Sequence, residues 1–299
     1  MATADKGVLI AQITDTHVGF EPEAGDEEFN FLRFCMAIDH LLDQHVQPDL
    51  LILTGDVADK GRPDSYERIK GPLSRCNFPV HVMTGNHDNR TNLLAAFPDC
   101  PTMTTLQGKP YVQYALDVGS LRIVCLDTLQ HGRHGGAFCE GRADWLDSEL
   151  AAHPATPTLI MMHHPPIVAG IGWMDPRPDE AWLARFAAAI KGHEQIVGIV
   201  CGHLHRPVAS VFETIPVAVT PAVAPAVSLD LRPVDFHKAD GRGIVDGEPP
   251  AYALHRWKDG KLVTHFQPVG DWTRLAVYTE NLVPMMEGLE RERRPHGGS

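Results

Sequence analysis

Five short motifs in the chain carry carboxylate, amide and imidazole side chains, the groups that bind divalent metal ions in many enzymes. Each motif directly follows an apolar run that indicates a β-strand. In chain order they are Asp15-Thr16-His17, Gly55-Asp56, Gly85-Asn86-His87-Asp88, His163-His164-Pro165-Pro166 and Gly202-His203-Leu204-His205. Residues two apart on an extended chain point to the same side, so Asp15 and His17 can face one ion.

The five motifs are informative only as a set. A single D-x-H or H-x-H motif arises by chance fairly often in a chain with 17 histidines, and alone it indicates ordinary hydrogen bonding. Five motifs in order, each after a strand, are different, because strand ends on one edge of an α/β sheet converge. The sequence therefore predicts a metal site at that edge.

The side chains in these motifs suit two metal ions that share one carboxylate. Asp56 follows a glycine that allows a tight turn and is central in the order of motifs, so we assign it as the bridging ligand. The remaining ligands form one set for each ion: Asp15, His17 and His205, then Asn86, His163 and His203. No thiolate belongs to the set, and we expect two divalent ions per chain, drawn from Mn, Fe, Zn and Co.

The segments between the motifs alternate between strand and helix patterns. Apolar runs indicate buried strands at residues 8–14, 50–54, 79–83, 158–162 and 196–201. Apolar residues at helical spacing predict helices at residues 28–44, 64–73 and 180–191. A Gly119-Ser120 turn predicts a hairpin of residues 111–118 and 121–126, and residues 251–257 and 261–267 are expected in a second sheet. This alternation is typical of an α/β fold with a mainly parallel sheet.

Composition limits the partners and the compartment. Acidic residues outnumber basic ones by 38 to 26, and the formal net charge of −12 argues against long nucleic acids and membranes as partners. We see no secretion signal and no span-length apolar stretch, and the six cysteines include no C-x-x-C pair, so we expect a cytoplasmic protein. We expect a catalytic domain at residues 1–270, a partly disordered tail at residues 271–299, and a homo-oligomer, dimeric or higher.

The order of the five motifs resembles the signature of the calcineurin-like metallophosphoesterase family, from Asp15 to His205, about two-thirds of the chain. The sequence is most similar to a bacterial branch that contains glycerophosphodiesterases and class III cyclic-nucleotide phosphodiesterases. Met162 to Pro166, followed by Met174-Asp175-Pro176, carries that closer similarity. The resemblance implies a four-layer αββα sandwich of two mixed β-sheets flanked by helices, and a metal-bridging hydroxide as the nucleophile.

The resemblance also implies roles for single residues. The family's ligand lies two positions before the proline, which selects His163 over the adjacent His164. His87 of the GNHD motif is expected beside the metals, steadied by the neighbouring Asp88, where it contacts phosphoryl oxygens or the leaving group; both are candidate catalytic residues. Asn86, His87 and Trp173 are the candidate substrate-binding residues.

One feature differs from the pattern of this bacterial branch, and the role of one loop is left open by the sequence. Relatives in the branch supply a further histidine after the GHxH motif, but here residues 221–225 (PAVAP) have no polar side chain. Residues 130–140 carry His131, Arg133, His134 and Cys139 among glycines, and they either reach over the site or form a solvated loop.

We expect hydrolysis of small phosphodiesters. An apolar wall at residues 169–178, with Trp173 and Met174, suits a singly charged diester, and no cluster of Arg and Lys accompanies the motifs. The alternative is a phosphomonoesterase or nucleotidase, since the same metals serve both reactions. Less favoured are a nuclease and a non-catalytic scaffold, because a scaffold of this fold usually loses ligands and every ligand position is filled here.

Overall fold

A computed structural model describes residues 7–100, 104–106 and 108–293. The chain divides into two compact units, Met1–Val269 and Gly270–Ser299. Within the second unit, where we expected a partly disordered tail, the structure contains a short 3-10 helix, η2 (Glu280–Leu282), and a helix, α6 (Val283–Arg293). None of the helices in the described residues combines the length and apolarity that crossing a membrane requires.

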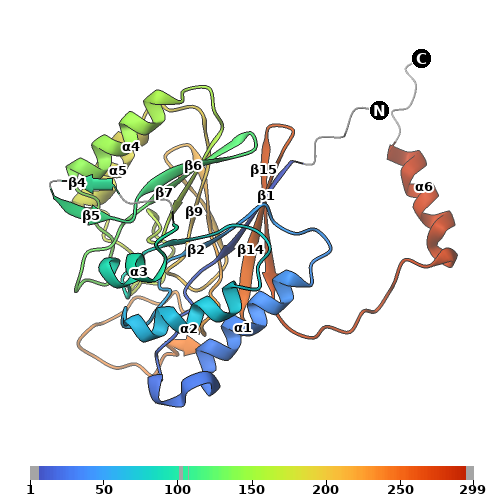
Figure 1. The fold of residues 1–299 in the computed structure, drawn as a ribbon, viewed down its shortest axis with the longest axis horizontal. Coiled ribbons are helices and arrows are strands. Elements are labelled where there is room, and N and C mark those ends of the chain that lie inside the picture. The colour runs from blue at the N-terminus through green and yellow to red at the C-terminus, as the bar shows by residue number, and fades with distance from the viewer. Residues whose placement is uncertain (1–6, 101–103, 107, 294–299) are drawn as a thin grey trace. The chain divides into compact units, whose positions relative to one another are not determined.

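The first unit contains two mixed β-sheets (Figure 1). The first has the order β15-β14-β1-β2-β3. Its strands are β1 (Val8–Ile13), β2 (Leu50–Thr54), β3 (Val80–Met83), β14 (Ala251–Lys258) and β15 (Lys261–Pro268). The second has the order β10-β11-β9-β8-β7-β6. Its strands are β6 (Tyr114–Val118), β7 (Leu121–Leu126), β8 (Thr158–Met162), β9 (Ile196–Cys201), β10 (Val208–Phe212) and β11 (Ile215–Val219). Two short pairs complete the strands: β4 (Thr104–Leu106) with β5 (Lys109–Tyr111), and β12 (Ala226–Val227) with β13 (Val245–Asp246).

Alternation along the strands shows that the two sheets pack face to face. On β7, Ile123 and Cys125 join the apolar core that contains the first sheet, whereas Val124 and Leu126 join the core of the helices on the other side. Both faces of β7 are thus buried, which explains its unbroken apolar run. The four-layer sandwich expected from the sequence is confirmed.

Helices cover the outer faces of both sheets. The first sheet carries α1 (Phe29–Leu42), α2 (Pro63–Leu73) and α3 (Arg90–Ala96), and the second carries α4 (Glu140–Ala152) and α5 (Ala181–Ile190). In Figure 1, α1 and α2 lie on the opposite side of the sheets from α4 and α5. On α1 the buried residues Phe34, Ile38 and Leu41 recur every three or four positions, so one apolar face meets the sheet. A further 3-10 helix, η1 (Pro22–Glu27), precedes α1.

One strand assignment from the sequence was wrong. We expected residues 251–257 and 261–267 in the second sheet, but β14 pairs antiparallel with β1, and β15 extends the first sheet beyond it. A buried side-chain network accounts for this placement: Gln12 Oε1 lies 2.9 Å from His255 Nε2, and Gln12 Nε2 donates to Thr54 Oγ1 at 2.7 Å. Gln12 Nε2 also donates to the carbonyl oxygen of Cys201 at 3.1 Å, which connects the two sheets. Such a long-range partner is invisible in a local sequence pattern.

Candidate active site

The five motifs converge at the carboxyl ends of β1, β2, β3, β8 and β9, as the sequence predicted. The backbone there is not the extended chain that we assumed. Of the seven non-glycine residues with positive φ in the described chain, five are candidate ligands: Asp15 (53°), His17 (46°), Asp56 (48°), His203 (71°) and His205 (53°). Left-handed backbone is costly for such residues and collects at functional sites. The side chains of Asp15 and His17 therefore reach one place by a tight turn rather than by strand alternation.

Asp56 lies between the two candidate ligand sets. Its Oδ2 atom is 3.5 Å from His17 Nε2 and 3.3 Å from His163 Nε2, and its Oδ1 accepts the backbone N–H of His87 at 2.8 Å. The preceding Gly55 has a φ of 100°, and a Cβ there would lie 2.6 Å from the backbone nitrogen of Gly85. Only glycine fits, so this turn fixes the Asp56 carboxylate at the centre of the site.

The first ligand set is Asp15, His17 and His205, whose ligand atoms lie within 4.8 Å of one another. Each histidine is held through Nδ1, which leaves Nε2 facing the centre. His17 Nδ1 lies 3.2 Å from Asp59 Oδ1, and His205 Nδ1 lies 2.8 Å from the carbonyl oxygen of Pro225. Such outer partners fix the tautomer and orientation of a metal-binding imidazole.

The second set is Asn86, His163 and His203. His163 Nδ1 lies 3.0 Å from the carbonyl oxygen of Thr54. Its buried Nε2, like the buried Oδ1 of Asn86, has no hydrogen-bond partner among the described residues. Buried polar atoms without partners are rare in proteins, and here both are donor atoms suited to a divalent ion. The residues present therefore fit a metal ion at this place.

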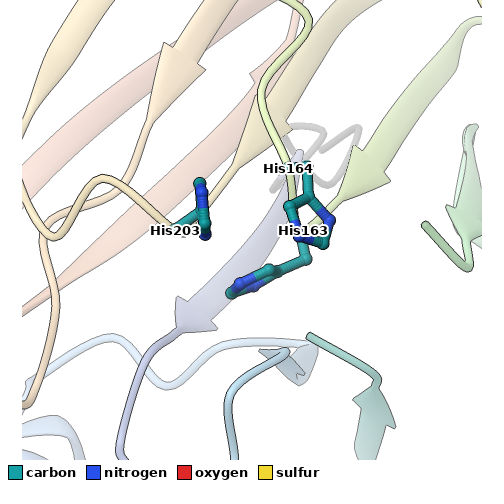
Figure 2. Close-up of side chains that lie close together, drawn as sticks. All are labelled: His163, His164 and His203. Carbon is teal, nitrogen blue, oxygen red and sulfur yellow. The ribbon is translucent and has the colours of Figure 1, made fainter. Parts of the chain in front are cut away.

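Figure 2 shows His163, His164 and His203 gathered from the ends of β8 and β9, and their ligand atoms lie within 4.8 Å of one another. His164 differs because both of its ring nitrogens have partners. Its Nδ1 lies 2.7 Å from Thr128 Oγ1, and its Nε2 lies 3.1 Å from the carbonyl oxygen of His134. His163 Nε2 faces the carboxylates of Asp56 and Asp15, which are candidate ligands themselves, whereas both ring nitrogens of His164 have partners outside the ligand set. This difference supports His163 as the ligand.

The charges around the centre favour bound cations. Burial disfavours ionisation of Asp56, but the His163 and His17 rings hold its carboxyl pKa well below the ordinary range. Burial alone would lower the pKa of His163, and the carboxylates of Asp56 and Asp15 outweigh it and raise that pKa to about 9. Burial, together with the neighbouring His164 and His163 rings, keeps the pKa of His203 well below its usual value, so this ring is neutral and its lone pair is available.

One relationship taken from the resemblance is wrong. Asp88 does not steady His87: its carboxylate accepts the backbone N–H groups of Val57, Ala58 and Gly85 and the hydroxyl of Tyr66, all within 3.2 Å. Burial and then the Asp56 charge raise the pKa of Asp88 to about 6. The residue that holds His87 is Asp59, whose carbonyl oxygen lies 2.8 Å and whose carboxylate lies 3.3 Å from His87 Nδ1.

Asp59 was not among the predicted site residues, although it is buried and contacts both His17 and His87. The sequence does contain an indication of this role, because Asp59 follows Asp56 by three residues and so belongs to the same loop. Asp88, in contrast, holds the loops after β2 and β3 together through backbone donors, a role that leaves no mark in the sequence.

Two cavities flank the candidate metal centre. The larger, about 390 Å³, is bounded by His17, His87 and His205 on the centre's side. The smaller, about 130 Å³, is bounded by His203, His134 and Trp173. The loop at residues 130–140 therefore does reach the site, since the His134 ring lies 4.7 Å from the His203 ring and is stacked on Trp173 at 6.4 Å.

The chain is similar to proteins that are named as phosphodiesterases. The chain is 28% identical over 265 residues to a probable glycerophosphodiester phosphodiesterase of Arcobacter nitrofigilis, covering 88% of this chain and 94% of that one. It is 31% identical over 240 residues to a probable cyclic nucleotide phosphodiesterase of Rhodopseudomonas palustris, covering 78% and 82%.

The fold and the family agree with these similarities. A dimetal phosphatase from Danio rerio has a similar fold, with a TM-score of 0.62 and 15% identity over 88% of this chain and 97% of that one. The sequence model of the calcineurin-like phosphoesterase family matches residues 8–207, which contain all five motifs. This chain belongs to the calcineurin-like phosphoesterase family.

Proposed function

We propose that this chain hydrolyses small phosphodiesters, of the glycerophosphodiester or cyclic-nucleotide type, with two divalent metal ions. The observation that carries the proposal is the position of Asp56, whose Oδ2 lies within 3.5 Å of an imidazole nitrogen from each ligand set. The names of the similar proteins support the same substrate class.

Seven side chains would hold the ions, with Asp56 shared: Asp15, His17 and His205 on one side, and Asn86, His163 and His203 on the other. Mn, Fe, Zn and Co suit this mixture of oxygen and imidazole donors. When bound, such ions polarise a phosphoryl oxygen and lower the pKa of water.

His87 is the candidate for proton transfer. Its ring lies 4.6 Å from the His17 ring, beside the candidate metal centre, so it can meet the oxygen of a leaving group there. Burial alone would lower its pKa, but the hydrogen bond to Asp59 and the Asp56 charge raise it to about 9, which favours the proton-donating form. Asn86 would bind phosphoryl oxygen, and Trp173 would contact the part of the substrate in the smaller cavity.

The charges of the cavity walls favour a diester over a monoester. Among the described residues that line either cavity, Arg133 is the one arginine or lysine. A monoester carries a second negative charge, which these walls do not compensate. We therefore expect kcat/KM for bis(4-nitrophenyl) phosphate to exceed that for 4-nitrophenyl phosphate by at least about tenfold.

The experiment combines this comparison with metal analysis. Parent protein should bind about two divalent ions per chain, and Asp56→Ala should lose both, or retain one weakly, together with its activity. Full metal content and normal turnover in Asp56→Ala would refute the two-metal assignment. A better rate with the monoester would refute the diester assignment and leave the metal site standing.

We also propose that the protein works in the cytoplasm as a homo-oligomer. The six cysteines, all within the described residues, are unpaired, which suits a reducing compartment. Size-exclusion chromatography with light scattering tests the oligomer, and a mass equal to one chain would refute it.

A further inference from the structure

Resting on the proposed function, we propose that the larger cavity binds an uncharged, apolar ester group of the substrate and that Phe20 and Phe29 select for it. Within the proposed class this favours a diester of the glycerophosphodiester type, with one small ester group and one bulky apolar group, aryl or similar. It disfavours a cyclic nucleotide, whose two ester oxygens belong to one sugar. The inference differs from the sequence analysis, which placed the apolar wall at Trp173, beside the smaller cavity.

Two aromatic side chains form one wall of the larger cavity and face open space. Phe20 is 58% exposed and Phe29 is 54% exposed, and both line the cavity together with His17 and His205. Exposed aromatic rings next to a polar centre mark ligand contacts more often than scattered surface residues do. A ring or alkyl chain placed between them would remove apolar surface from water at both.

The segment that presents these rings is fixed by internal contacts. The buried Glu28 carboxylate accepts the backbone N–H groups of Gly19 and Phe20 at 2.8 Å and 2.9 Å, and it pairs with Arg68 at 2.7 Å. Gly19 has a φ of 92°, and a Cβ there would lie 2.1 Å from Ser65 Oγ, so the turn demands glycine. The wall is therefore preorganised, which lowers the entropic cost of binding.

Another part of the lining is also apolar and held in place. It consists of Ala224, Pro225 and Val245. The buried Arg33 on α1 donates to the carbonyl oxygens of Val223 at 2.6 Å, Ala224 at 3.2 Å and Glu248 at 2.8 Å, and so fixes this segment against the helix. Ala224 and Pro225 belong to the PAVAP segment, where relatives in the branch are expected to carry a histidine. In this chain an apolar surface takes that place.

The charges around the larger cavity select against anionic groups. Its acidic lining residues are Glu21, Glu28 and Asp59, and none of its described lining residues is an arginine or lysine. A further phosphate or carboxylate on the ester group would meet repulsion there. Hydroxyl groups on the ester group would not find a partner in the Glu28 carboxylate, because it is already occupied by backbone donors and Arg68. An uncharged apolar group suits both facts.

The test compares two diesters that share a leaving group, phenyl 4-nitrophenyl phosphate and methyl 4-nitrophenyl phosphate. In the parent, kcat/KM should favour the phenyl ester by at least about tenfold, or 1.4 kcal/mol. In Phe20→Ala/Phe29→Ala this ratio should fall at least fivefold. Phe236→Ala, a matched control at a residue that is 74% exposed and does not line the cavity, should keep the parent ratio. Phe20→Leu/Phe29→Leu should give an intermediate ratio and replaces the alanine variant if that variant does not fold.

A binding measurement separates this inference from the proposed function. Calorimetry on the Mn²⁺-loaded protein should show phenylphosphonate binding at least about tenfold more tightly than methylphosphonate, with the preference reduced in Phe20→Ala/Phe29→Ala. If diesters are hydrolysed but the double variant keeps both preferences, the inference is wrong and the function stands. The same holds if Trp173→Ala alone removes the preference. If no diester is hydrolysed, the proposed function fails, and the phosphonate preference still decides whether the cavity binds apolar groups.

Discussion

Asp59 is the residue whose replacement tests the architecture of the site most directly. Its carboxylate lies 3.2 Å from His17 Nδ1, and within the described part of the chain no hydrogen bond or ion pair joins it to Asn86, His163 or His203. Burial opposes its ionisation, but hydrogen bonds from His17 and His87 hold its pKa well below the ordinary range. Replacing Asp59 with alanine should therefore weaken the binding of one metal ion and leave the binding of the other unchanged.

The size of the effect follows from this one contact. A hydrogen bond to a charged group is worth about 1.5–3 kcal/mol, or about 10- to 150-fold in affinity. Outer partners of metal-binding histidines typically contribute about 10- to 100-fold. We expect Asp59→Ala to lose about 10- to 100-fold in affinity for the ion held by Asp15, His17 and His205. Asp59→Asn keeps a neutral acceptor and should lose about half as much free energy.

The assay is a calorimetric titration of metal-free protein with Mn²⁺ or Zn²⁺, fitted to two sites. Asp64→Ala is the matched control, because Asp64 is an exposed carboxylate of the same region, paired with Arg62. Its two affinities should equal those of the parent. If Asp59→Ala also binds both ions within about twofold of the parent, Asp59 does not orient His17 and our reading of the first ligand set is wrong.

Three further changes test other parts of the reasoning. His87→Ala should keep its metals and lose about 10²–10⁴ in rate on esters with poor leaving groups, but much less on nitrophenyl esters; an equal loss on both would assign His87 to phosphoryl binding instead. Burial lowers the pKa of His255 to about 3, below the unfolded value of about 6.5, so its contribution to stability is present above pH 6.5 and is lost as pH falls towards 3. Chemical denaturation at pH 7 and pH 5 measures how much unfolding free energy is lost between the two. We expect this loss to be about 2 kcal/mol smaller in His255→Gln than in the parent or in His265→Gln, which replaces an exposed histidine as a control. Equal losses in all three proteins would contradict a buried neutral ring. Gly55→Ala should cost about 2–4 kcal/mol of unfolding free energy, because its Cβ meets Gly85, whereas Gly132→Ala, at a similar positive φ with no described atom within 4 Å, should cost clearly less; equal losses would show that φ alone is responsible.

The sequence predicts the strands and the convergence of the five motifs well because both depend on local patterns. Strands such as β2 and β8 are unbroken apolar runs, and β-α-β alternation places their ends at one edge. The helices α3 and α4 were missed for physical reasons. On α3, which has 7 residues, only Leu93 and Ala96 are buried, too few to form a periodic pattern. On α4 only Arg142, Leu146 and Leu150 are buried, and Arg142 is charged, so its inward face does not read as apolar.

The features that could not be predicted from the sequence depend on contacts between residues far apart in the chain. The pairing of β14 with β1 rests on partners some 240 residues apart, such as Gln12 and His255. The role of Asp59, and the use of Asp88 to hold two loops together, also appear only once the chain has folded. The larger cavity is a further case, since α1 and the PAVAP segment approach each other through Arg33.

The central position of β1 in the first sheet has a consequence for synthesis of the chain. β1 is made first, but one of its two neighbours, β14, ends at Lys258, so its apolar edge has no partner until nearly the whole chain has left the ribosome. Unpaired strand edges on nascent chains invite association with other chains. Region 8–207, which matches the family, ends before β14 and therefore lacks the strand that closes this edge. We expect chains truncated near residue 207 to aggregate during expression. In the full chain, the risk of aggregation at β1 should end only when the β14–β15 hairpin pairs with it.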